Sequence, residues 1–154
     1  MTFGVAAISS FLNNQTFRSN YNNGYGIQAA VRILPATNLF AEANLGFAYH
    51  GFTSSNPLGE TGFDYGSLNK LFGGITTGYQ QNINHSADFY VGAGLQISSY
   101  QLDALFDTEN AQGLNSFYGE AGVHLGMLGI MLRYGLANNN GRQSLIEYGI
   151  RLNF

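Results

Sequence analysis

The stretch Tyr148-Gly149-Ile150-Arg151-Leu152-Asn153-Phe154 shows the pattern that governs the whole chain. Every second residue is large and apolar or aromatic, and the residues between them are Gly, Arg and Asn. Successive side chains of a β-strand point to opposite faces, so the two sets lie on opposite sides of one strand. One face suits contact with lipid, and the other suits a polar interior.

The same alternation recurs along the chain in eight segments. In each segment, apolar residues at every second position face away from Gly, polar or charged residues. The first segment is the least regular, because Phe3 and Val5 compete with Ile8 for the apolar face. The eight segments are 3–12, 25–34, 39–50, 70–81, 89–100, 117–126, 130–136 and 147–154.

The connections between these segments alternate between two lengths. Short or moderate turns are expected at 35–38, 82–88 and 126–129, and mostly longer loops at 13–23, 51–69, 101–116 and 138–143. Short turns on one side and longer loops on the other are typical of barrels that cross an outer membrane. With an even number of strands, both termini fall on the short-turn, periplasmic side. The sequence therefore predicts one all-β domain over residues 1–154, an eight-stranded antiparallel up-and-down transmembrane β-barrel.

Composition supports a membrane barrel and excludes several other classes of protein. Charged residues make up 10% of the chain, against about 25% in soluble domains. No run of 18 or more apolar residues exists, which excludes transmembrane helices. The absence of Cys excludes disulfides and zinc–thiolate sites, and a net charge of −3 gives no reason to expect nucleic-acid binding.

The charges also indicate which face of the barrel points outward. A soluble, lipocalin-like barrel alternates in the same way but carries its polar face outside. That exterior would need many charges, whereas these segments carry few, and the two signs are balanced. Glycines share the polar face, where they make room inside a barrel that is barely wide enough for its own side chains. The expected lumen charge network consists of Arg32, Glu42, Glu120, Arg133, Glu147 and Arg151.

The alternating pattern Tyr148, Ile150, Leu152, Phe154 resembles the closing strand of bacterial outer-membrane β-barrels. The architecture of the whole chain resembles the eight-stranded superfamily that includes the membrane domain of OmpA, OmpX and OmpW. This resemblance implies that the four residues form an assembly signal for the barrel assembly machinery. It also implies a monomer in contact with outer-membrane lipid and lipopolysaccharide. The start of the chain lacks the basic and apolar regions of a signal peptide, so a mature form is expected.

The charged residues of the lumen are predicted to meet across neighbouring strands. Pairing around the turn at Pro35 places Arg32 opposite or diagonal to Glu42. Arg133 falls between Glu120 and Glu147, on the strands before and after its own. A buried arginine between two carboxylates can satisfy its fork of donors. The network either gates an ion path or fills the lumen as a plug, and we expect the plug.

The histidines are the only candidate catalytic residues in the sequence. Some barrels of this size modify the acyl chains of lipopolysaccharide with a His and a Ser near the outer rim. Here His50 ends the third segment, and Ser54, Ser55 and Glu60 follow in the loop. A nucleophile needs its base within hydrogen-bond reach and a third group that orients the base. No recognisable motif surrounds these residues, and we expect no enzymatic activity.

The remaining histidines and acids predict no metal or cofactor site. His85-Ser86 falls in a periplasmic turn, on the wrong side for surface lipid chemistry, and His124 is expected to be a hydrogen-bonded lumen residue beside Glu120. Three scattered histidines lack ligand spacing. The acidic stretch 103–109 lacks the spacing and the turn glycine of a calcium loop.

Function is therefore expected at the loops. The loops 51–69 and 101–116 mix acidic residues with Phe and Leu, which can anchor a partner or pack over the barrel mouth. We expect a structural or surface-interaction protein that binds through these loops. The alternatives are a narrow channel for small or hydrophobic solutes and, after it, a lipid-modifying enzyme.

Overall fold

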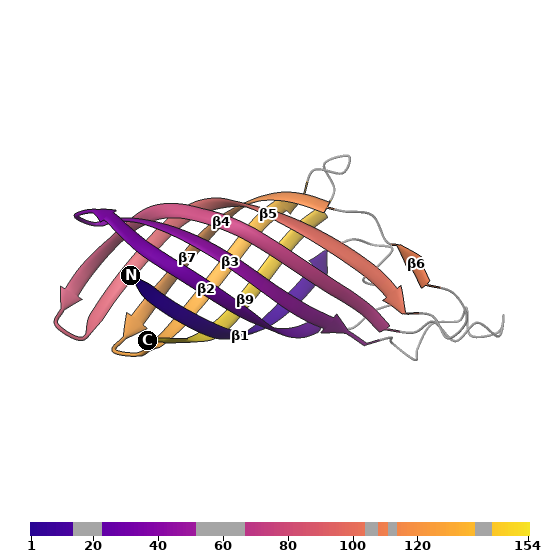
Figure 1. Ribbon diagram of the computed structural model, residues 1–154, viewed down its shortest axis with the longest axis horizontal. Coiled ribbons are helices and arrows are strands. Elements are labelled where there is room, and N and C mark those ends of the chain that lie inside the picture. The colour runs from indigo at the N-terminus through magenta and orange to yellow at the C-terminus, as the bar shows by residue number, and fades with distance from the viewer. Residues whose placement is uncertain (14–22, 52–66, 104–107, 111–113, 138–142) are drawn as a thin grey trace.

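The computed structural model describes residues 1–13, 23–51, 67–103, 108–110, 114–137 and 143–154. Within these ranges, antiparallel strands follow one another along the chain (Figure 1). The strands are β1 (Thr2–Asn13), β2 (Gly24–Ala36), β3 (Leu39–His50), β4 (Ser67–Asn84), β5 (Ala87–Asp103), β6 (Thr108–Asn110), β7 (Leu114–Leu125), β8 (Leu128–Ala137) and β9 (Gln143–Asn153). No helix in the described part of the chain is long and apolar enough to cross a bilayer.

Eight of these strands close into a barrel, as the sequence predicts. Each strand pairs with the one before it in the chain, β4 pairs with β5, and β1 pairs with β9 to form the closing seam. The short β6 stands outside this ring, because it pairs with only three residues at one end of β5. Both termini lie at the end of the barrel that carries the tight β2–β3, β4–β5 and β7–β8 turns (Figure 1). We call this end the turn end and the opposite one the loop end.

Several strands are longer than the alternation predicts, so the turns are shorter. The expected turn 82–88 shrinks to two residues, His85 and Ser86, because β4 and β5 stay paired beyond their apolar stretches. Pro35 belongs to β2, where a register shift between Ile33 and Ala36 admits a residue without an N–H. Strand β6 lies inside the predicted loop 101–116. Polar residues pair as readily as apolar ones, so the pattern of apolar residues marks only the middle of a strand.

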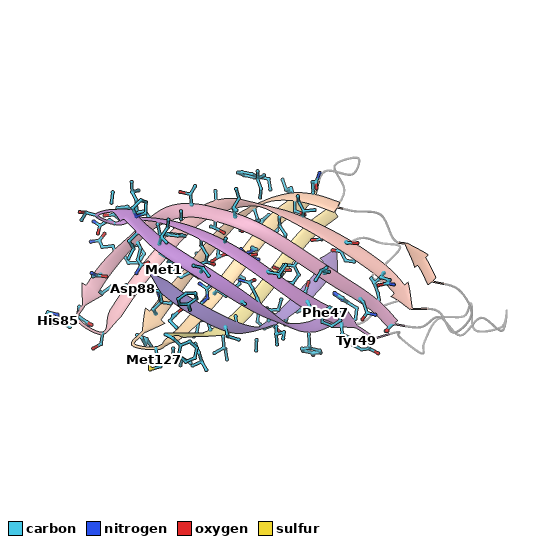
Figure 2. All side chains as sticks on the ribbon, in the orientation of Figure 1. Met1, Phe47, Tyr49, His85, Asp88 and Met127 are labelled. Atoms are coloured by element: carbon cyan, nitrogen blue, oxygen red, sulfur yellow. The ribbon has the colours of Figure 1, made fainter. Side chains whose placement is uncertain are left out.

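The predicted orientation of the two faces is confirmed. On β1, Phe3 and Val5 point outward while Ile8 is 3% exposed and points inward, which resolves the competition within the first segment. Phe47 and Tyr49 lie on the outer surface near the loop end, and Met127 lies at the turn end (Figure 2). The outside of the barrel is thus an apolar belt around a polar interior.

Aromatic side chains mark the two ends of the apolar belt. Near the loop end, Tyr25 of β2 and Tyr49 of β3 are paired in register and exposed, as is Phe117 of β7. Near the turn end the exposed aromatics include Phe3, Tyr79, Phe89 and Phe154. These positions match the interfacial girdles of outer-membrane barrels, in which amphipathic rings lie at the level of the lipid headgroups.

Glycines on the inner face leave space for large lumen side chains. A Cβ atom at Gly94 would meet the carbonyl oxygen of Ile75 and lie 2.7 Å from the ring of Tyr118. A Cβ atom at Gly122 would lie 2.5 Å from the ring of Tyr90. Tyr90 and Tyr118 are both fully buried, so the glycines fix where these rings fit.

Candidate functional site

Arg133 of β8 forms the centre of the polar interior. In the strand register it lies directly opposite Glu120 of β7 and Glu147 of β9. Its Nε and Nη2 atoms donate to Oε2 of Glu120 at 3.0 and 2.6 Å, and Nη1 donates to Oε2 of Glu147 at 3.0 Å. The side chains of all three residues are 0% exposed. The structure therefore brings together the arginine and the two carboxylates that the sequence places on adjacent strands.

The contacts of Arg133 extend beyond the neighbouring strands. Nη1 also donates to Oε1 of Gln96 on β5 at 3.0 Å and to Oε1 of Gln28 on β2 at 3.3 Å. The guanidinium lies 4.4 Å from the centre of the Tyr118 ring, a cation–π arrangement. Strands β2 and β5 lie on either side of β8 around the ring without pairing with it. One side chain thus connects walls of the lumen that face each other.

A second cation reaches the same carboxylate from the far wall. Lys70 of β4 donates through Nζ to Oε1 of Glu147 at 2.5 Å, and its Nζ lies 3.5 Å from the Ser10 hydroxyl oxygen. Strand β4 is four pairings away from β9 in both directions around the barrel. We call Glu120, Arg133, Glu147 and Lys70 the inner cluster. Lys70 is not part of the charge network predicted from the sequence, because β4 pairs with neither β8 nor β9.

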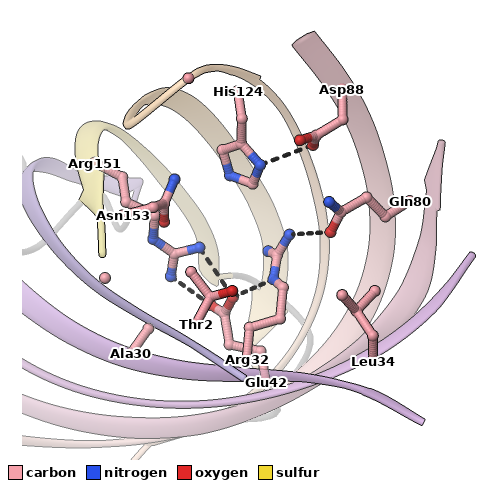
Figure 3. Close-up of a pocket in the computed structure, with 12 residues that line it drawn as sticks. Thr2, Ala30, Arg32, Leu34, Glu42, Gln80, Asp88, His124, Arg151 and Asn153 are labelled. Carbon is pink, nitrogen blue, oxygen red and sulfur yellow. Dashed lines mark hydrogen bonds and ion pairs between the residues drawn. The ribbon is translucent and has the colours of Figure 1, made fainter. Parts of the chain in front are cut away.

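Closer to the turn end, two arginines share one carboxylate. Glu42 of β3 accepts from Nε of Arg32 at 2.8 Å and from Nη1 and Nη2 of Arg151 at 2.9 and 2.6 Å (Figure 3). Arg32 and Glu42 are register partners, whereas Arg151 comes from β9. The Arg32 guanidinium lies between the rings of Phe40 and Tyr90, 4.1 Å from each centre. We call Arg32, Glu42 and Arg151 the mouth cluster.

His124 of β7 borders the mouth cluster. Its Nδ1 lies 2.8 Å from Oδ1 of Asp88 on β5, and its ring stacks on Tyr90 at a centroid distance of 5.0 Å. The sequence predicted a hydrogen-bonded histidine inside the barrel beside Glu120, and the hydrogen-bond partner in the structure is Asp88. His85 lies in the turn between β4 and β5, at the turn end (Figure 2).

The candidate catalytic group is only partly described. His50 ends β3 and is 0% exposed, with its side chain on the inner face. Its predicted partners Ser54, Ser55 and Glu60 lie outside the described residues. Among the residues that are described, no three His, Cys, Asp or Glu side chains gather as a metal site would require.

The predicted assembly signal occupies the outer face of β9. Tyr148, Ile150, Leu152 and Phe154 are each between 47% and 66% exposed, so all four project toward the surrounding membrane. The backbones of Phe3 and Phe154 exchange hydrogen bonds of 3.2 and 2.8 Å at the turn end of the seam. The terminal aromatic ring is thus held in place by backbone bonds that do not depend on its side chain.

Comparison with known proteins identifies the fold. No protein family and no curated protein sequence matches the chain. Solved structures do match over nearly its whole length: Neisserial surface protein A has a TM-score of 0.67 at 12% identity, covering 99% of this chain and 96% of that one. This is the fold of the small eight-stranded outer-membrane β-barrels.

Two further small outer-membrane barrels align equally completely. Ail, the attachment invasion locus protein of Yersinia pestis, has a TM-score of 0.63 at 12% identity, covering 99% of this chain and 97% of that one. The outer membrane enzyme PagL has a TM-score of 0.63 at 13% identity and covers 98% of both chains. An attachment protein, a surface protein and an enzyme thus share one architecture, which does not by itself fix function. The fold and the apolar belt together support an outer-membrane location.

Proposed function

We propose that this protein is a non-enzymatic outer-membrane barrel whose lumen is filled by its own side chains and which acts at the cell surface through its loop end. The observation that carries the proposal is the inner cluster. Arg133 and Lys70 reach partners on β2, β5, β7 and β9, so the cluster ties together strands all around the barrel. Its four charged side chains are 0% exposed.

A filled lumen is the arrangement expected for a barrel of this size. Eight strands enclose an interior just wide enough for side chains, whereas wide aqueous pores need about 16 strands. An ion passing the inner cluster would have to displace several charge-assisted hydrogen bonds at once. Each such bond in a buried setting contributes about 1.5–3 kcal/mol. The free-energy cost of breaking these bonds favours a structural role for the inner cluster over a path for ions through the lumen.

The distribution of charge supports a role for the loop end. Apart from Asp103 at the end of β5, the eight barrel strands contain four basic and four acidic residues. In the sequence, Asp103 and the charged residues of the segments that connect the strands at the loop end amount to five acids against two arginines, which accounts for the net charge of −3. These residues are Glu60, Asp64, Asp103, Asp107 and Glu109, with Arg18 and Arg142.

This charge favours a basic partner at the surface. Ail has been solved in complex with the heparin analogue sucrose octasulfate, a polyanion. An acidic loop end repels such a ligand, because like charges across an interface raise the free energy of association. We infer a protein partner with a basic face. Binding would weaken as salt is raised, and exchanging Asp103 and Asp107 for Asn would slow association.

Conductance of the refolded protein in a planar bilayer tests the closed lumen. We expect silent membranes after insertion, with folding verified by the heat-dependent shift in gel mobility. Reproducible openings that change with Lys70→Met would contradict the filled lumen. They would favour the narrow channel, with the inner cluster as its gate.

Enzymatic action on lipid is tested separately. Incubating the refolded protein with lipopolysaccharide should release no fatty acid, as measured by mass spectrometry. Release that is lost in His50→Asn would establish the lipid-modifying alternative.

A further inference from the structure

The turn end of the lumen contains a cavity of about 200 Å³. Its floor is the buried mouth cluster, and its rim includes the half-exposed side chains of Gln80 and Asp88 (Figure 3). Because the rim belongs to the turn end, the cavity faces the periplasm. The inner cluster lies deeper in the barrel and is separate from this cavity.

Two arginine nitrogen atoms of the mouth cluster have no hydrogen-bond partner among the described residues. They are Nη2 of Arg32 and Nε of Arg151, and both are fully buried atoms. A guanidinium can only donate hydrogen bonds. A buried donor that stays unpaired costs about 1–3 kcal/mol. Both arginines line the cavity, so each brings one unpaired donor to its wall.

The acceptors within the cluster are already engaged. Both oxygens of Glu42 accept from the two arginines, and Oε1 of Gln80 accepts from Nη1 of Arg32 at 3.1 Å. Asp88 is the other carboxylate facing the cavity, and it pairs with His124 at the rim, where its side chain is 20% exposed. The two guanidinium groups thus share one buried carboxylate.

We propose that this cavity binds an oxyanion of the carboxylate or phosphate class from the periplasmic side. Guanidinium groups match these planar or multidentate acceptors better than any other side chain. The position of Arg32 is constrained by Phe40 and Tyr90, whose nearly perpendicular rings each lie 4.1 Å from its guanidinium. The bound oxyanion accepts from Nη2 of Arg32 and Nε of Arg151 and balances the positive charge that the two arginines hold beyond that of Glu42.

The inner cluster provides an internal control. All nitrogen atoms of the Arg133 guanidinium are hydrogen-bonded, and two carboxylates face two cations there. None of these three nitrogen atoms is left without an acceptor. An anion that binds at the mouth should be sensed by Arg32 and Arg151 and not by Arg133.

Nuclear magnetic resonance of the refolded protein in dodecyl maltoside micelles tests the site directly. Inorganic phosphate and then acetate are titrated while the arginine Nε–Hε resonances are followed. We expect saturable shifts for Arg32 and Arg151 and none for Arg133. Shifts that grow linearly, or that appear equally at Arg133, would overturn the proposal and leave water as the acceptor.

A matched pair of variants tests whether a carboxylate supplied by the chain itself replaces the bound oxyanion. Gln80→Glu supplies a carboxylate to Arg32 from within the chain, so phosphate affinity should fall at least about tenfold. Gln81→Glu adds the same charge at the neighbouring exposed position of β4, and its affinity should stay within about twofold. Equal affinities in the two variants would refute the site.

The source of the oxyanion is resolved by changing the lipid. Nanodiscs of phosphatidylglycerol without added phosphate present the group only as a headgroup. If Arg32 and Arg151 already show the bound shifts there, a lipid phosphate fills the site. If they shift only after phosphate or acetate is added, the site takes a free anion.

Discussion

Lys70 and Glu147 project from opposite walls of the barrel and meet in an ion pair of 2.5 Å. Neither side chain is exposed. Glu147 also accepts from Arg133, so one carboxylate joins cations on β4 and β8. These contacts connect opposite strands across the lumen. Substitutions of the residues that make them should therefore change the stability of the barrel.

Replacing Arg133 by Met should destabilise the barrel strongly. The change leaves Glu120 without its cationic partner in a buried position, at a cost of about 3–5 kcal/mol. Urea unfolding of the refolded protein in micelles measures this loss. Leu132→Met, at the adjacent outward-facing position, should change the unfolding free energy by less than about 1.5 kcal/mol. Equal unfolding free energies in the two variants would show that Arg133 does not stabilise the barrel.

The Lys70–Glu147 pair should behave as a coupled unit. Lys70→Met and Glu147→Gln each leave a buried charge with fewer partners, so each should be costly alone. The double variant removes both charges, and its loss should be smaller than the sum by about 1–3 kcal/mol. A double-mutant cycle of unfolding free energies gives this coupling. Additive losses would mean that the two residues act independently.

Two glycines on β4 should respond differently to the same change. A Cβ atom at Gly78 would collide with the backbone carbonyl of Val91, so Gly78→Ala should cost about 1–3 kcal/mol. At Gly73 the nearest atoms, on Asn44 and Leu45, are 3.6 Å away, an ordinary contact. Gly73→Ala should change stability by less than about 1 kcal/mol. The comparison fails if both variants unfold at the same urea concentration.

The apolar belt predicts a penalty that depends on depth in the membrane. Ile75 lies near the middle of β4 and is 62% exposed, so Ile75→Arg should cost about 2–4 kcal/mol in lipid vesicles. Gln81, also outward-facing and closer to the turn end, should accept Arg at about 0–1 kcal/mol. A uniform penalty would argue against a membrane around this surface.

The terminal aromatic should matter for assembly more than for stability. Phe154 is 66% exposed, and its backbone bonds to Phe3 do not involve its ring. Phe154→Ala should therefore shift the unfolding free energy by no more than about 1 kcal/mol. In cells, we expect several-fold less folded protein in the outer membrane than for Leu128→Ala, which removes an apolar side chain of the neighbouring strand. An unchanged amount of folded Phe154→Ala protein in the outer membrane would contradict an assembly signal at the terminal aromatic residue.

The sequence could predict the features of the fold that arise between neighbours along the chain. Period-two alternation determines which face meets lipid, and adjacent strands bring Arg32 to Glu42 and Arg133 to Glu120 with little freedom of register. Contacts across the lumen depend on how the strands stagger when the ring closes. Lys70 and Glu147 are 77 residues apart, and Glu42 and Arg151 are 109 apart, on strands that do not pair. A pattern of neighbouring residues in the sequence therefore cannot predict these contacts across the lumen.

The closing strand also supplies the last counter-ion of the inner cluster. Strand β9 contributes Glu147 to the inner cluster and Arg151 to the mouth cluster. Before β9 docks, Lys70 and Arg133 have only Glu120 between them as a buried counter-ion. Closure of the barrel and charge balance of the inner cluster are therefore one event. A barrel closed without β9 would leave two buried cations with one carboxylate, which disfavours a seven-stranded closure.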